Sequence, residues 1–234
     1  MIGLGSTEFL LAVPSLPRLE LTQLSNELFD SWELHIESSL ELPDYSLFLQ
    51  VEEGSIKGMA KIGALLGAVY FGIGNYGDFV SGVKTIREQL SATSDYLAEH
   101  AGRVFSCPSS STTMRKQGGA LGALQRLFIK MQKGVLTPDE AMLQAETLFA
   151  NESAAVLGFL NDLENSSRTC PRFHEQLQLP LSHMGEDELY GVDDMKRPTR
   201  LPRPKPALPS PLQFRVEVWR ESKKTSKQTK VIQL

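Results

Sequence analysis

The N-terminal part of the chain combines short apolar runs with one longer segment of helical spacing. Residues 8–13 are an apolar run that prolines end, which predicts a short buried strand. Over 21–32, leucines recur as they do on one face of an amphipathic helix. Residues 33–37 alternate between polar and apolar, and 45–51 form a more apolar run, so both are predicted to be strands. Residues 1–55 therefore predict a small β-α-β-β unit, whose apolar sheet face another element must cover.

The next segment has no charged residue from Ile62 to Gly77, and it contains five glycines. We expect this run to lie in a helix over about 56–77, followed by a second helix over about 78–103, with both covering the sheet. Its sixteen uncharged residues fall between the roughly 10–14 of buried core helices and the about 20 of a membrane span. Whether the protein contacts a membrane therefore depends on this run.

The glycines of this predicted helix indicate a close contact with some other surface. Gly63 and Gly67 form a G-x-x-x-G pair, and Gly74 falls two turns further along the same face. Glycine costs about 1 kcal/mol relative to alanine inside a helix, so the run needs a compensating role. Tight packing in the core supplies one role, and contact with a membrane or a second copy supplies another. The candidate contact residues are Gly63, Gly67, Phe71 and Gly74.

The middle of the chain changes from this α+β unit, over 1–105, to a helical region. Residues 106–119 are rich in serine and threonine and low in hydrophobicity, which predicts an exposed linker. Over 120–165 the apolar spacing predicts a helix near 121–131, a second helix after Gly134 and a third over about 152–163. The second helix has Thr137 as its N-cap, proline at its first position and acidic residues in its first turn.

One part of this helical region resembles a known family. The pattern Leu124-x-x-Leu-Phe-x-x-Met-x-x-Gly134-Val-Leu-Thr-Pro-Asp-Glu140, followed by Leu148, is similar to the SHOCT-type short helical hairpin over about 121–150. The second helix lacks the many charged residues of typical members. The resemblance implies a small interaction or oligomerisation element, and it carries over no functional residues.

The C-terminal part reads as a linker followed by a strand. Residues 166–211 are a loop and a proline-rich stretch that should adopt extended polyproline II structure. In the tail, 212–234, residues 212–219 alternate strictly and predict a strand. This strand could pair with an edge of the N-terminal sheet or add to the sheet of a partner. The candidate partner-binding residues are Arg203, Pro206 and Pro209 of an R-x-x-P-x-x-P pattern, with Phe214, Val216 and Val218 on one face of the strand.

Charge is distributed unevenly along the chain. The net charge is −4, but residues 196–234 carry +9 and residues 1–195 carry −13. A basic tail on an acidic body can contact a membrane surface, an acidic partner or the body itself. Nucleic acid is a weaker expectation, because few aromatic side chains accompany the basic residues of the tail.

The sequence shows no catalytic or metal-binding signature. Cys107 and Cys170 have no C-x-x-C spacing, the four histidines are scattered, and no nucleophile elbow is present. We therefore expect no catalytic residue, no cofactor and no metal. The paucity of cysteines and the lack of a basic N-terminal region favour a cytoplasmic protein, with membrane association as an alternative.

These patterns support three hypotheses on an α+β fold. The first is a non-catalytic interaction or assembly protein that binds a protein partner or itself through the helical hairpin and the strand-bearing tail. The second is a membrane-associating or membrane-inserting protein that uses the glycine-rich helix at 56–77. The third is an enzyme without a recognisable motif.

Overall fold

The computed structural model describes residues 1–76, 78–107, 112–149, 152, 156, 158–171 and 213–234. Helices are combined with one antiparallel sheet, which confirms the predicted α+β class. The elements within these ranges are β1 (Ile2–Leu11), α1 (Arg18–Ser39), β2 (Ser46–Glu52), β3 (Ile56–Ala64), α2 (Leu66–Gly74), α3 (Phe79–Val104), β4 (Thr112–Gln117), α4 (Gly119–Gln132), α5 (Pro138–Phe149), α7 (Phe159–Thr169), β5 (Phe214–Arg220) and β6 (Gln228–Gln233).

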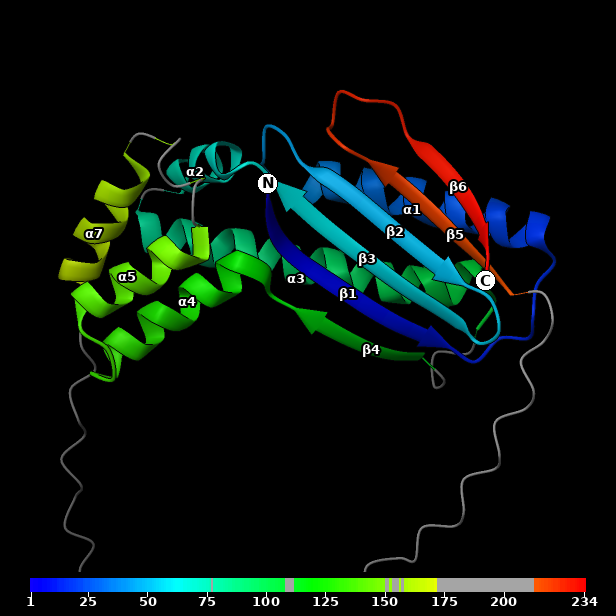
Figure 1. The fold of residues 1–234 in the computed structure, drawn as a ribbon, viewed down its shortest axis with the longest axis horizontal. Coiled ribbons are helices and arrows are strands. Elements are labelled where there is room, and N and C mark those ends of the chain that lie inside the picture. The colour runs from blue at the N-terminus through cyan, green and yellow to red at the C-terminus, as the bar shows by residue number, and fades with distance from the viewer. Residues whose placement is uncertain (77, 108–111, 150–151, 153–155, 157, 172–212) are drawn as a thin grey trace, which may run out of the picture.

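The sheet has the strand order β4-β1-β3-β2-β5-β6, and each neighbouring pair is antiparallel. Its first four strands, with α1 and α3, follow the β-α-β-β-α-β connectivity of the ferredoxin-like split β-α-β arrangement. The β5–β6 hairpin extends this sheet beyond β2 (Figure 1). Because unrelated functions share this connectivity, it positions a site without identifying it.

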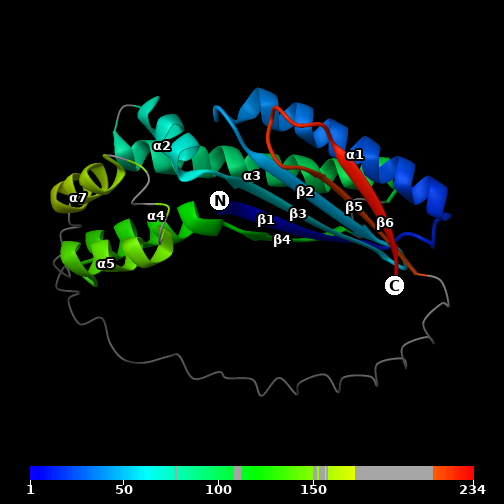
Figure 2. The same ribbon diagram turned by 45° about the horizontal axis from the view of Figure 1, so that its top comes forward.

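Helices α1 and α3 cover one face of the sheet, as Figures 1 and 2 show. Strand residues alternate accordingly, and Leu47 and Leu49 of β2 are buried on this side. Helices α2, α4, α5 and α7 gather at one end of the sheet, where the ring of Phe159 contacts those of Phe79 and Phe149. No described element lies over the opposite face, an arrangement that antiparallel sheets tolerate when their outward residues are polar.

The predicted strand at 33–37 is wrong, because these residues continue α1. Phe29, Trp32 and Ile36 recur three and four positions apart, and all three are buried against the sheet. Leu34 made the segment alternate in the sequence, yet it is 68% exposed on the outer side of the helix. The exposed Leu34 thus produced the alternating pattern that is typical of a strand.

The predicted helix over 56–77 is wrong in its first half, because residues 56–64 form β3. This strand pairs with both β1 and β2, and its inward positions include Ile56, Gly58 and Ala60. Glycine is required at 58, since a Cβ there would lie 1.9 Å from the Phe9 ring of the neighbouring strand. The β-α-β-β order is therefore present, but its third and fourth elements are β2 and β3.

Only the second half of the uncharged run is helical. Helix α2 has nine residues, so Gly63 on β3 and Gly67 on α2 do not form a helical G-x-x-x-G pair. Within the described residues, no helix has the length and apolar character needed to cross a membrane. The second predicted helix is confirmed as α3, which begins after the N-cap Asp78.

The helical region agrees with its prediction in two of three helices. Helices α4 and α5 lie where they were expected, and Thr137 and Glu140 exchange capping-box hydrogen bonds. The end of the predicted third helix overlaps α7, which begins at Phe159, and Glu152 is also helical, whereas most of 150–157 lies outside the described residues. The expected linker over 106–119 is also corrected, because 112–117 form the edge strand β4, which pairs with β1.

The predicted C-terminal strand is confirmed as β5, and it returns to the chain's own sheet at β2. The residues after β5 form a turn and a second strand, β6, which pairs with β5. Within the described part of the tail, 213–234, three of the six basic side chains are paired with carboxylates of the body. Three ion pairs join the hairpin to the body, namely Arg215–Glu52, Arg220–Glu33 and Lys227–Asp30.

The turn of this hairpin is held by Asp44, which precedes β2. Its carboxylate accepts hydrogen bonds from the Ser222 hydroxyl and from the backbone N–H groups of Lys223 and Tyr45. Burial alone would raise the pKa of Asp44, but these hydrogen bonds hold it below its usual value. Asp44 therefore fixes where the tail meets the body.

Candidate binding face of the sheet

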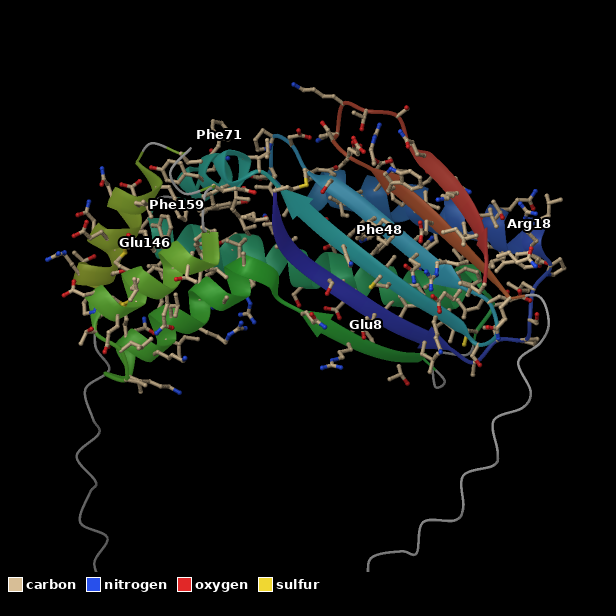
Figure 3. The ribbon with its side chains drawn as sticks, in the orientation of Figure 1. Glu8, Arg18, Phe48, Phe71, Glu146 and Phe159 are labelled. Carbon is tan, nitrogen blue, oxygen red and sulfur yellow. The ribbon has the colours of Figure 1, made fainter. Side chains whose placement is uncertain are left out.

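The face of the sheet opposite α1 and α3, here called the open face, brings side chains from all six strands together. Figure 3 shows Phe48 and Glu8 on this face. Residues of neighbouring strands stand opposite one another in cross-strand rows. The three central rows are Gln117–Ser6–Lys61–Phe48–Trp219–Gln228, Arg115–Glu8–Met59–Gln50–Glu217–Lys230 and Thr113–Leu10–Lys57–Glu52–Arg215–Ile232.

Two aromatic side chains stand side by side on the open face. Phe48 of β2 and Trp219 of β5 are direct cross-strand partners, and both are half-buried. Each is out of phase with the buried residues of its own strand, so neither serves the core. The ammonium group of Lys61 lies 5.8 Å from the centre of the Phe48 ring, within the range of a cation–π contact. Aromatic residues gathered in this way are typical of binding surfaces.

A hollow of about 540 Å³ adjoins this aromatic pair, within the usual size range of ligand sites. We call it the glycine-floored hollow, because the row beyond Phe48 is Gly3–Gly63–Ser46 and two of its three positions lack a side chain. A Cβ on Gly3 would meet no atom within 4 Å. The register of β1 against β3 shifts between Gly3 and Gly5, a bulge of the kind found beside functional sites.

Charges on the open face are only partly paired. Arg215 binds Glu52 through two nitrogens, at 2.8 and 2.6 Å, so this pair is neutral. Lys57 and Lys61 of β3 are exposed, and within the described residues neither has a carboxylate in ion-pairing distance. The row from Gln117 to Gln228 thus contains one cation, Lys61, and no anion.

A second, smaller hollow lies on the same face, near the other end of the strands. Its volume is about 360 Å³, and Leu10, Met59 and Arg115 are among its lining residues. Apolar groups thus lie at both ends of this polar face, and exposed apolar groups of this kind indicate an interaction surface. The open face is therefore the part of the described chain that best fits a binding surface.

The structure separates the residues that the sequence proposed for self-association or membrane contact. Gly63 belongs to the open face, where it lines the glycine-floored hollow. Gly67, Phe71 and Gly74 belong to α2, at the helical end of the molecule, and all three are exposed. Phe71, labelled in Figure 3, is 64% exposed, and Leu65, the residue before α2, is 56% exposed.

The proposed partner-binding tail is divided in a similar way. Val216 and Val218 are fully buried in the chain's own core. The guanidinium carbon of Arg18 lies over the Phe214 ring, 5.7 Å from its centre. Their apolar face is therefore used within the chain. Arg203, Pro206 and Pro209 lie outside the described residues.

Sequence reasoning missed Phe48, Lys61 and Trp219, although two of them left a signal. Phe48 alternates with Leu47 and Leu49 in its strand, and Trp219 alternates with Val218 in another, so each aromatic side chain had to face away from the core. Nothing in the sequence indicated that the two strands would be neighbours.

Catalytic chemistry has little support in the described residues. No three His, Cys, Asp or Glu side chains there gather closely enough to hold a metal ion. Burial raises the pKa of the Cys170 thiol, against an opposing hydrogen bond with Gln132, and so disfavours the nucleophilic thiolate.

Comparison with known proteins adds no assignment. No protein-family model, no curated protein and no solved structure matches the chain.

Proposed function

We propose that the chain is a non-catalytic binding protein whose ligand lies on the open face of the sheet. The observation that carries this proposal is the adjacent pair Phe48 and Trp219, beside a hollow on a sheet face that no described element covers. Aromatic residues at the centre of a polar, partly charged surface are the usual composition of a recognition site.

The proposal keeps the interaction role expected from the sequence but moves its surface. The helical hairpin of α4 and α5 buries Leu124, Phe128 and Phe149 within the chain, and the tail strand buries Val216 and Val218. Burial of these apolar groups leaves them unavailable to a partner without local unfolding. The open face needs no such rearrangement.

The charge order of the open face favours a different molecule over a second copy. In the middle row the ends are cationic, at Arg115 and Lys230, and Glu8 and Glu217 stand one position inside them. Stacking two copies about a two-fold axis parallel to the strands would place Arg115 over Lys230 and Glu8 over Glu217. An axis across the strands would place each charge over itself, so both arrangements oppose like charges.

Affinity capture from an extract of the source cells tests the proposal, with bound proteins and nucleic acids both identified. The full chain is compared with a Phe48→Ala/Trp219→Ala variant and with a Leu34→Ala/Leu143→Ala control, whose two leucines are exposed on helices α1 and α5. We expect the open-face variant to lose the captured species and the control to retain them. Equal capture by all three folded proteins would overturn the proposal.

A second candidate function, peripheral membrane contact, rests on the exposed Leu65 and Phe71 in an uncharged stretch of chain. Such a contact would place α2 at the surface of the bilayer, since an exposed apolar helix face can lie in the interface. Phe71→Asp should abolish salt-resistant flotation with neutral liposomes and leave the fold intact. Absence of flotation by the unmodified chain would remove this candidate.

A further inference from the structure

The glycine-floored hollow has a shape, a stacking surface and a charge that together specify a class of ligand. We propose that it binds a nucleotide, with the base against Phe48 and Trp219 and the phosphate at Lys61. This inference rests on the proposed function of the open face and names the ligand of that face.

The shape of the hollow comes from missing side chains. Gly3 and Gly63 face each other across β1 and β3, so the sheet surface is recessed between Met1 and the aromatic pair. A Cβ on Gly63 would lie 2.8 Å from the Ser46 hydroxyl, so a side chain there would displace this hydroxyl and fill part of the recess. The recess is large enough for one mononucleotide, because ligand sites of this kind begin at roughly 300 Å³.

The stacking surface comes from two strands that are far apart in sequence. Phe48 and Trp219 are direct partners across β2 and β5, and both line the hollow. Bases stack on such side chains because every base has a π-face, which makes this contact tolerant of base identity. Ser46 adds a hydroxyl that lies 3.0 Å from the Met1 sulfur and 3.2 Å from the Gly63 carbonyl oxygen. It is the donor in either contact, so its lone pairs can accept from an amino group of the base.

The charge of the hollow favours an anion at one place. Three cationic groups border it, and two are already neutralised: Arg220 pairs with Glu33, and the amino group of Met1 pairs with Glu152. Lys61 is the third, and within the described residues it has no carboxylate partner. Glu221, the one carboxylate among the lining residues, is exposed at the end of β5. A phosphate at Lys61 would therefore gain an ion pair that the chain itself does not supply.

Tryptophan fluorescence of the full chain provides a direct test. The protein has two tryptophans, and Trp32 is buried in the core, so Trp219 is the one that a base can contact. We expect AMP to quench this fluorescence saturably, with a dissociation constant in about the micromolar to millimolar range. Adenosine, which lacks the phosphate, should bind more weakly.

Matched variants separate the two contacts. Lys61→Gln should weaken AMP by about tenfold and leave adenosine unchanged, because it removes only the phosphate contact. Lys57→Gln is the control: it removes another exposed lysine from the same strand and face, but outside the hollow, and should leave AMP binding unchanged. Phe48→Ala should weaken AMP and adenosine alike. Circular dichroism establishes that each variant is folded.

The affinity of the chain for a short single-stranded oligonucleotide shows whether its ligand is a free nucleotide or part of a nucleic acid strand. An affinity well above that of AMP would identify the strand as the ligand, and an affinity equal to that of AMP would identify the free nucleotide. The inference is overturned if AMP causes no saturable quenching, or if Lys61→Gln and Lys57→Gln affect AMP equally. If either occurs while cellular capture still depends on Phe48 and Trp219, the nucleotide assignment fails and the proposed function stands.

Discussion

At the scale of single residues, Gly58 and Phe9 show how β1 and β3 pack together within the core. They are cross-strand partners on the buried face, and the ring of Phe9 covers the space where a side chain at 58 would be. An aromatic ring over a strand glycine both fills the gap in the core and fixes the register of the pair.

Gly58→Ala should therefore destabilise the protein by about 1–3 kcal/mol, since the added Cβ overlaps a core ring that has nowhere to move. Gly3→Ala on the neighbouring strand is the matched control, because its Cβ would meet nothing within 4 Å. Urea unfolding of both variants measures the difference. If the two changes cost the same, the Phe9 ring does not occupy that space.

At the scale of elements, the sequence predicted helices with marked ends better than strands. Thr137 followed by Pro138 predicted the start of α5 correctly, because capping groups act locally. The predicted start of α3 near residue 78 also agrees with the structure, in which Asp78 is the N-cap. The errors at 33–37 and 56–64 have one cause: a short stretch can satisfy both periods, and only tertiary contact decides. For β3, the decisive contacts are β1 and β2 on its two sides.

The cap of α3 offers a test with a defined pH dependence. Asp78 accepts hydrogen bonds from the Ser81 hydroxyl at 2.7 Å and the Ser81 N–H at 2.8 Å, and these bonds lower the pKa of Asp78. Asp78→Ala should cost about 1 kcal/mol at neutral pH, and Asp78→Asn much less, because the amide oxygen also caps.

The sign of the pH effect follows from the lowered pKa. A carboxylate favoured in the folded state stabilises the protein above its unfolded pKa, and this contribution is lost as pH falls through the folded pKa. As pH falls from about 5 to 3, the unfolding free energy of the unmodified protein should therefore decrease relative to that of Asp78→Asn, whose amide does not titrate. Denaturant unfolding across that range measures it, and a pH-independent gap would contradict the role of the cap.

At the scale of the whole molecule, the candidate binding face could not have been predicted from the sequence, although two of its residues left a signal there. The sequence marks Phe48 and Trp219 as aromatic residues out of phase with their strands, but only the pairing of β2 with β5 makes them neighbours. The same pairing brings basic residues of the tail to the acidic body, where Arg215, Arg220 and Lys227 form ion pairs. Long-range register is the information that local pattern lacks.

The β5–β6 hairpin should therefore unfold together with the rest of the sheet, and its two strands should contribute unequally to the stability of the protein. In β5, Val216 and Val218 are completely buried, and each such side chain contributes about 1.5–3 kcal/mol. The side chains of β6 are exposed or only partly buried, so its loss removes less apolar burial. Removal of both strands would also leave the β2 edge unpaired, which invites association with other chains.

A chain that ends at Lys224 should stay folded with a modestly lower melting temperature, because it keeps β5 and the contacts of Asp44 with the turn. A chain that ends before Gln213 should unfold or aggregate at 25 °C, since the loss from β5 is a large part of the about 5–15 kcal/mol that stabilises a domain. Thermal unfolding followed by circular dichroism, with light scattering for association, tells the two apart. If the shorter chain melted like the full one, β5 would contribute no stability to the sheet, and Trp219 would not be held beside Phe48.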